Sequence, residues 1–304
     1  MSINWKPKKY LLTLPLILYF VFIYRTQFDN QFTLVDDAMI SMRYAENLIN
    51  GNGLVFNQGE YIQGYTNLGW VLWMATLHLF VSNPSLLIML SSAIALTCLV
   101  YIVYKITELL NGNILAVILT ACYYPLIFWS LRGMETGLMA LLIYLMLYLI
   151  LKNDSSWKIG LIASLLILIR LDTFPILMVL FLYYRKGYIY PVITLAGVLM
   201  FQYLYYDSIL PNTYYLKTQG AGILERVVRN WEVIDFKELL IIPFALITVR
   251  NKKLFLIFAL FLIQFIYSFY VGGDYTDLIT DRFIVLGMPA IFILLSLYGK
   301  EDIA

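Results

Sequence analysis

The sequence has few of the residues on which several common kinds of site depend. It contains one histidine and two cysteines in 304 residues. The lone histidine, His78, excludes a metal site built from several histidines. Both cysteines, Cys98 and Cys122, lie inside apolar runs, so we expect two separate buried thiols rather than a disulfide.

Charge is also scarce. Charged residues make up 13% of the chain and hydrophobic residues 62%, whereas a soluble domain has about 25% charged and about 45–50% apolar residues. The net charge of +2 comes from basic residues that stand singly or in pairs between apolar runs, so we expect no nucleic-acid partner. Continuous apolar runs of this kind predict an all-α polytopic membrane protein in contact with the lipid bilayer.

The distribution of basic residues predicts the orientation. Lys6, Lys8 and Lys9 precede the first apolar run, which places the N-terminus in the cytoplasm and makes that run an anchor rather than a cleaved signal peptide. The stretch 66–81 is ambiguous, because it is short for a span and contains polar residues. It either crosses the membrane or lies in the interface as an amphipathic helix.

Charge counting favours the interface for residues 66–81. If this stretch crossed, the cluster at 185–186 and the cluster at 250–253 would face outward, against the positive-inside rule. We therefore predict about ten transmembrane helices, with both termini inside. The expected spans are residues 10–25, 85–107, 114–130, 135–151, 158–169, 173–184, 188–206, 238–249, 254–271 and 283–298.

This topology divides the chain into two parts. Residues 1–206 form the predicted transmembrane catalytic module, which includes the first external loop, 26–84. Residues 207–304 hold a second long external loop and the C-terminal transmembrane helices. Apolar residues recur at near-helical spacing within 223–234, which predicts a helix lying flat on the outer surface.

The most polar stretch of the chain lies in the first external loop and begins with two adjacent acids, Asp36 and Asp37. Adjacent carboxylates repel each other unless a cation or hydrogen bonds compensate. Their oxygens suit Mg²⁺, Mn²⁺ or Ca²⁺, and one of them could serve as a general base. The alternative is a structural role, in which both acids favour the N-terminus of a helix.

Four further polar clusters fall on the predicted outer side. Glu135 stands at the start of a predicted span, and Arg132 precedes it by three residues. Glu135 is either an acid of the site or an acid that caps the helix, in which case Arg132 is an interfacial cation. Arg170 and Asp172 interrupt an apolar run, and such residues are functional candidates by default, although a buried structural pair is the alternative. The other candidate binding residues are Asn212, Lys217, Asp274 and Arg282, together with Tyr65 as a ring that could stack on a sugar.

The two external cations Lys217 and Arg282 suit a phosphate or pyrophosphate, and plain anchoring at the interface is the alternative. Asp274 follows a Gly-Gly turn that would let the backbone approach a ligand. Each cluster alone is a weak signal. Their common location on one face of the membrane is the stronger indication of a site.

The motifs also resemble those of a known group of enzymes. The run VDDAMISMRYAENLINGNGLVFNQGEYIQGYTNLGW is followed by GMET, RLD, LPNTYYLK and then GGD with a later RF. In this order they resemble polytopic glycosyltransferases of the GT-C superfamily, in particular bacterial enzymes similar to the mycobacterial terminal arabinofuranosyltransferase. The chain is shorter than many members of that family and differs from them between GGD and RF.

This resemblance implies a fold and an activity. It implies interfacial jaw helices in the first external loop, with 66–81 as the second of them, and a polyprenyl-phosphate sugar as donor. By position, the catalytic acids would be Asp36, Asp37 and Glu135. The substrate-binding candidates Asn212, Lys217, Asp274 and Arg282 also match motif positions.

The sequence therefore predicts a membrane glycosyltransferase in the cell inner (cytoplasmic) membrane, with a multi-pass chain and an extracytoplasmic active site. It would move a sugar, for which a pentofuranose is one candidate, from polyprenyl phosphate to a glycan, lipid or protein acceptor. An aspartate of the first external loop would act as base or metal ligand, and the reaction would invert the anomeric carbon. The alternatives are a transporter or flippase of a lipid-linked sugar, and a non-catalytic assembly protein.

Overall fold

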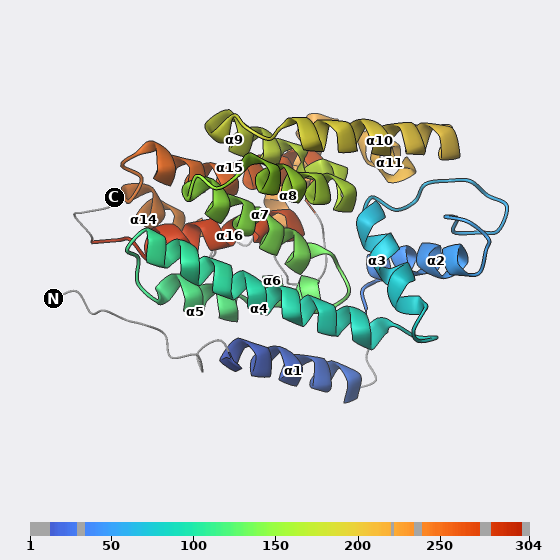
Figure 1. Ribbon diagram of the computed structural model, residues 1–304, viewed down its shortest axis with the longest axis horizontal. Helices are drawn as coiled ribbons and strands as arrows, with labels where there is room; N and C mark the ends of the chain where they lie inside the picture. The colour runs from blue at the N-terminus through green and yellow to red at the C-terminus, as the bar shows by residue number, and fades with distance from the viewer. Residues whose placement is uncertain (1–12, 29–33, 220–221, 234–238, 274–280, 300–304) are drawn as a thin grey trace.

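A computed structural model describes residues 13–28, 34–219, 222–233, 239–273 and 281–299 (Figure 1). Within these ranges the regular elements are helices, as the sequence predicts. In chain order they are α1 (Thr13–Phe28), α2 (Asp36–Ile49), α3 (Leu68–His78), α4 (Ser85–Leu109), α5 (Leu115–Cys122), α6 (Tyr124–Leu131), α7 (Thr136–Leu151), α8 (Ser156–Ile169), the short 3₁₀-helix η2 (Leu171–Thr173), α9 (Phe174–Tyr184), α10 (Ile189–Tyr206), α11 (Asn212–Gln219), α12 (Ile223–Val233), α14 (Ile242–Ile247), α15 (Lys252–Val271) and α16 (Arg282–Leu295).

Prolines mark the points where apolar runs are divided. Pro125 stands in the first turn of α6, directly after the break that separates it from α5. Pro175 stands in the first turn of α9, and before it Arg170 has an extended backbone with φ −150° and ψ 128°. Proline suits the first turn of a helix, where its missing N–H has no intrahelical partner to lose. The predicted turn around Asp172 and Pro175 is therefore present.

The bundle has two opposite ends, at which the helices begin and end. At one end the α4–α5 connection meets the end of α16, where Asn113 N–H donates to Ser296 O at 3.1 Å. At the same end the hydroxyl of Tyr184, the last residue of α9, donates to Asp154 O at 2.5 Å. The opposite end carries α2 and α3, at the right of Figure 1. We call it the α2/α3 end.

Three of the described helices are long and apolar enough to cross a bilayer: α4, α10 and α15. The count rises to four if α6 and α7, which meet at 119°, are taken as one span. The shorter apolar helices include α1, α8, α9 and α16. The structure therefore has the apolar helices of a membrane protein. At several of the about ten predicted spans, the described helices are shorter than a full crossing requires.

Two short helices bear on the predicted topology. Residues 66–81 contain α3, which has 11 residues. A helix of this length extends for about 16 Å, roughly half of a hydrocarbon core, so α3 is too short to span by itself. Similarly, the helix that the structure describes within the expected span 238–249, α14, has six residues. Pro243 lies in the first turn of α14, and Thr248 ends it.

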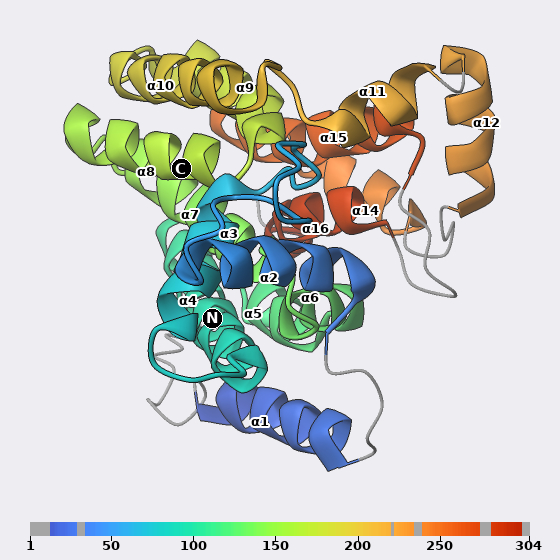
Figure 2. The same ribbon diagram turned by 90° about the vertical axis from the view of Figure 1, so that its right-hand side faces the viewer.

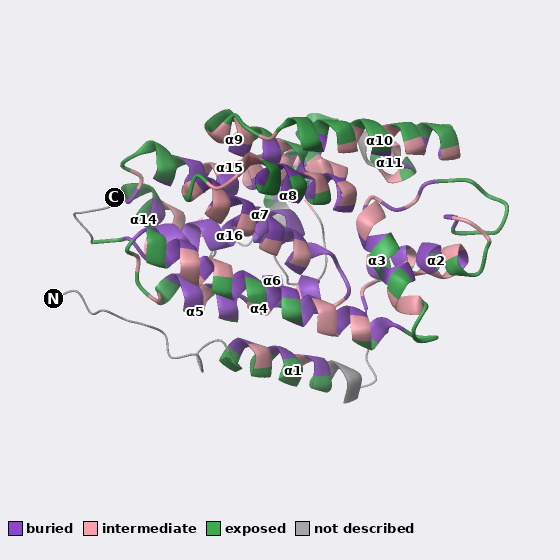
Figure 3. Ribbon diagram, viewed as in Figure 1, coloured by how far each residue is buried: buried purple, intermediate pink, exposed green. Residues whose placement is uncertain are grey.

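Apolar side chains cover much of the outside of the bundle. On α10, Ile193 is 65% exposed and Leu204 70% exposed, whereas nearly all of α16 is buried (Figure 3). Large exposed apolar surfaces are rare on soluble monomers and indicate contact with lipid or with another protein. Cys98 and Cys122 are also exposed and free. The prediction of two buried thiols was wrong. The outside of this bundle is itself apolar, so an apolar sequence environment does not imply that a side chain faces the interior.

Candidate functional site

An arginine holds two carboxylates together at the α2/α3 end. Arg170 lies between α8 and η2 and is 5% exposed. Its Nε and Nη2 donate to the two oxygens of Asp172, at 2.8 and 2.5 Å, and its Nη1 donates to Glu135 Oε1 at 2.6 Å. The planar guanidinium fork matches a carboxylate in this two-point geometry. The Arg170–Asp172 pair is thus present, as the structural alternative predicts, and Glu135 belongs to it.

Asn67 connects this pair to the first external loop. Its side-chain Nδ2 donates to Glu135 Oε2 at 2.8 Å, and its Oδ1 accepts from Ser41 Oγ at 3.0 Å. Glu135 is 1% exposed and Asn67 4% exposed. Both oxygens of Glu135 are therefore bonded to protein, which favours a positioning role for this carboxylate over direct contact with a substrate.

A second acid, Asp37, pairs with a different arginine. Arg282 Nη1 donates to Asp37 Oδ2 at 2.9 Å, and the side chain of Asp37 is 45% exposed while that of Arg282 is 8% exposed. Arg282 is the first residue of α16 and Asp37 stands in the first turn of α2. This contact joins residues 245 positions apart. Of the predicted catalytic acids, Asp37 is the one that has accessible surface beside a cation.

These residues surround a cavity of about 370 Å³. Asp37, Asn67, Arg170, Asp172 and Arg282 line it, and so do apolar residues of α2, η2 and α9. Volumes of roughly 300–1,000 Å³ with a few polar groups among apolar ones are usual for small-molecule sites. The cavity is therefore large enough to hold one sugar ring and its linking group.

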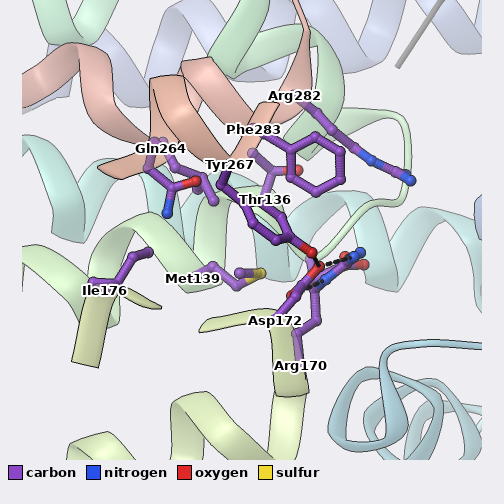
Figure 4. A pocket seen from close by; sticks show the side chains of 11 residues that line it. Thr136, Met139, Arg170, Asp172, Ile176, Gln264, Tyr267, Arg282 and Phe283 are labelled. Atoms are coloured by element: carbon purple, nitrogen blue, oxygen red, sulfur yellow. Dashed lines mark hydrogen bonds and ion pairs between the residues drawn. The ribbon is translucent and has the colours of Figure 1, made fainter. Parts of the chain in front are cut away.

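The floor of the cavity adjoins a much smaller pocket, in which Tyr267 and Arg170 are both directed at Asp172 (Figure 4). Tyr267 Oη donates to Asp172 Oδ2 at 3.2 Å, and its ring meets Phe283 edge to face at 5.2 Å. Asp172 consequently accepts from three donors on two residues. It is held in place from α15 as well as from its own turn.

Tyr65 also lines the cavity but presents little of its ring. It is 2% exposed, and its ring packs edge to face against Tyr44 at 4.9 Å and Tyr206 at 6.2 Å. Burial raises the pKa of the Tyr65 hydroxyl above its ordinary value, so the group stays protonated. Little of the Tyr65 ring is therefore accessible for stacking on a sugar.

The remaining residues that the sequence predicts for the site are not seen to line the cavity. The Asp36 side chain is exposed. Asn212 has an exposed side chain outside the cavity lining, although its backbone N–H donates to Gln63 O at 2.9 Å. Lys217 lies in α11, but its side chain is outside the described set, and Asp274 lies outside the described residues altogether.

The two adjacent aspartates have different hydrogen-bond partners. Asp36 Oδ1 accepts the backbone N–H of Asp37 at 2.9 Å, whereas Asp37 Oδ2 accepts from Arg282. Across the residues that the structure describes, no group of three or more His, Cys, Asp or Glu is placed to hold a metal ion. Arg282 bonds Asp37 Oδ2 and would compete with a cation for that oxygen, and we derive no step through a metal.

Several lining residues were absent from the predicted site. Gln202 is 2% exposed, and its Oε1 has no hydrogen-bond partner within the described part of the chain. Arg226 lines the opposite part of the cavity from α12. Tyr267 is one tyrosine in a chain that has 25. A glutamine or tyrosine inside an apolar run is a weak signal, and only the packing identifies which of them face the cavity.

Comparison with protein-family models, curated proteins and solved structures finds no match for this chain. The resemblance to GT-C glycosyltransferases therefore rests on the sequence motifs alone.

We expect Asn67→Ala to loosen the first external loop from the bundle. The change leaves Glu135 Oε2 without its donor, whereas Ser41 Oγ keeps the Asp37 carbonyl as acceptor at 3.3 Å. An unsatisfied buried polar group costs about 1–3 kcal/mol. Denaturant unfolding in detergent and the rate of proteolysis within residues 50–62 measure the effect. The control is Asn57→Ala, because Asn57 is exposed and its side-chain amide donates to the nearby Glu60 at 3.0 Å. Equal behaviour of the two variants would refute the bridging role.

Proposed function

We propose that this protein is a membrane glycosyltransferase that moves a sugar from a lipid-linked phosphate donor to an extracytoplasmic acceptor. The observation that carries the proposal is the cavity at the α2/α3 end, where the half-exposed carboxylate of Asp37 lies 2.9 Å from the guanidinium of Arg282. A carboxylate that has accessible surface and a fixed orientation can accept a proton from an incoming hydroxyl group.

The proposed reaction is a single displacement. The acceptor hydroxyl gives its proton to Asp37 as its oxygen bonds to the anomeric carbon of the sugar. The bond between that carbon and the phosphate oxygen breaks, and the phosphate leaves with the electron pair. The configuration at the anomeric carbon inverts, and no covalent enzyme intermediate forms. A phosphate leaving group needs a nearby cation more than it needs a proton, and arginine side chains line the cavity.

The surroundings of the cavity support a lipid-linked donor. Leu171 and Phe174 line it from η2 and α9, and the neighbouring helix α10 is exposed and apolar along much of its length. A polyprenyl chain would occupy such surfaces while its phosphate and sugar enter the cavity. The proposed setting is a multi-pass protein of about ten spans in the inner membrane, with α2 and α3 as interfacial helices. The sugar, for which a pentofuranose remains a candidate, and the acceptor follow only from the family resemblance.

A transfer assay and a flipping assay on one preparation test the class of protein. The purified full-length protein is reconstituted in liposomes with a radiolabelled polyprenyl-phosphate pentose or hexose and a cell-envelope glycan acceptor. We expect label to move to the acceptor, because Asp37 and the cavity form a site for displacement at one end of the bundle. The assay measures label in the glycan fraction and, separately, label that becomes inaccessible from outside. Movement of the donor across the bilayer without transfer would establish a transporter instead.

A further inference from the structure

Arg226 is a buried cation in the cavity wall that the proposed reaction has not used. It lies on α12 and is 6% exposed. Its Nη1 donates to Tyr270 O at 2.8 Å, and its guanidinium carbon lies 5.1 Å from the centroid of the Tyr270 ring. The residue therefore bonds the last turn of α15 and extends along a tyrosine ring into the cavity lining.

The charges of the cavity arginines are balanced unequally. Arg170 forms ion pairs with Glu135 and Asp172, and Arg282 forms one with Asp37. Among the described residues, no carboxylate forms an ion pair with Arg226, which donates to the Tyr270 carbonyl and lies over the Tyr270 ring. A buried charge is costly unless an opposite charge or a set of hydrogen bonds compensates it. Arg226 is therefore the cavity cation that is complementary to an anionic ligand.

Two tyrosine hydroxyls lie beside this guanidinium. Tyr214 Oη and Tyr270 Oη are 3.3 Å apart, and both residues line the cavity with Arg226. The three side chains come from α11, α12 and α15, and Figure 2 shows α11 and α12 next to each other on one side of the bundle. Hydroxyl groups donate hydrogen bonds to phosphate oxygens, and a guanidinium binds phosphate strongly. One of these hydroxyls donates to the other, so the cluster combines a charge with a neutral donor that an anion could use.

The orientation of α12 relates this cluster to a lipid surface. Arg226 and Asn230 are buried on its inner face, whereas Leu224 is 78% exposed, Ile223 67% and Trp231 56%. The exposed side of α12 thus combines large apolar residues with the charged Glu225 and Arg229, and an amphipathic surface of this kind suits the boundary of a bilayer. A phosphate joined to a lipid chain would reach Arg226 from that boundary.

We propose that Arg226, with Tyr214 and Tyr270, forms the phosphate subsite of the cavity, while Arg282 positions Asp37. The inference rests on the proposed function for the identity of the anion, which would be the phosphate of the lipid-linked donor. The two arginines then have different roles, because Arg226 neutralises the leaving group and Arg282 orients the base. A free phosphate ion has the same chemistry and is the other possible source.

Binding to the full-length protein in phosphatidylcholine nanodiscs tests this subsite. The probes are decaprenyl phosphate, the neutral alcohol decaprenol, and inorganic phosphate. We expect Arg226→Gln to weaken decaprenyl phosphate binding about 10- to 100-fold, as expected for a lost charged hydrogen bond, and to leave decaprenol binding unchanged. The matched control is Arg229→Gln on the same helix, because Arg229 is exposed, donates to Gly272 O at 2.9 Å and is outside the cavity lining.

Two further variants keep the test decisive if Arg226→Gln does not fold, as judged by size-exclusion profile and thermal midpoint. Arg226→Lys retains the charge but loses the planar fork, and Tyr214→Phe removes one hydroxyl donor, so each should weaken decaprenyl phosphate binding to a smaller extent. Wild-type affinity in both variants, or in a folded Arg226→Gln protein, would overturn the subsite. Equal weakening by Arg226→Gln and Arg229→Gln would overturn it as well.

The same measurements separate this inference from the proposed reaction. Arg226-dependent binding of decaprenyl phosphate without any sugar transfer would uphold the subsite and reject the glycosyltransferase. Sugar transfer with unchanged donor KM in Arg226→Gln would uphold the enzyme and reject the subsite. If inorganic phosphate binds as tightly as decaprenyl phosphate and competes with it, a free phosphate is the ligand and the lipid-linked assignment is rejected.

Discussion

Replacing Asp37 with asparagine is expected to lower sugar transfer by about 100- to 10,000-fold, the usual contribution of a general base. Asparagine keeps the size of the side chain and can still accept a hydrogen bond from Arg282, but it cannot accept the proton of the acceptor hydroxyl. The loss should therefore appear in kcat, with little change in the affinity for decaprenyl phosphate. Steady-state transfer kinetics of the purified variant, in the liposome assay, measure it.

The neighbouring acid supplies a matched control. Asp36→Asn removes the same charge one residue away, from an exposed side chain that is outside the cavity lining. We expect near-normal transfer from this variant. If both variants lose activity equally, the effect is electrostatic or structural rather than proton transfer. If Asp37→Asn transfers sugar at the normal rate, Asp37 is not the base.

The sequence could single out this pair of acids as candidates, but not which of the two faces the cavity. Adjacent residues on an α-helix differ by about 100° in direction, so Asp36 and Asp37 cannot both face the same cavity once they lie in α2. The choice depends on how α2 packs on the bundle. Ala38 and Ser41 are buried on its inner side, which turns Asp37 towards Arg282 and leaves Asp36 exposed.

The pairing of Glu135 shows a second limit of sequence reasoning. Arg132 and Glu135 are three residues apart, a spacing that brings side chains together on a helix. The segment is not helical throughout, because Gly133 has φ +92° and separates α6 from α7. Arg132 lies over the Phe128 ring at 5.4 Å instead, and Glu135 pairs with Arg170, 35 positions later in the chain.

The gathering of polar residues at one end was easier to predict than their contacts. The connections between successive spans lie on alternate sides of the membrane. Counting the apolar runs therefore assigns each polar cluster to one side. In the structure Asp37, Glu135, Arg170 and Arg282 do meet at the α2/α3 end. The lengths of the helices were less predictable, because breaks such as the one before Pro125 depend on local backbone geometry as well as on hydropathy.

The second large effect is expected from Arg170→Gln, which should destabilise the protein by about 3–5 kcal/mol, as is usual when one partner of a buried ion pair is removed. The change leaves both Glu135 and Asp172 without their cation. Arg43→Gln is the control, because Arg43 and Glu46 form an exposed pair with side chains 46% and 45% exposed, and such pairs contribute about 0–1 kcal/mol. Denaturant unfolding in detergent compares the two variants.

A double variant tests whether uncompensated charge is the cause of that loss. Arg170→Gln combined with Glu135→Gln removes one of the two stranded carboxylates, and its new carboxamide can still accept the hydrogen bond from Asn67. If buried charge dominates, the double variant should be more stable than Arg170→Gln alone, so the two changes are not additive. If the two losses simply add, Arg170 stabilises the protein mainly through packing against Phe283, whose ring centroid lies 5.8 Å from its guanidinium. In that case the ion pairs would orient the site without holding the bundle together.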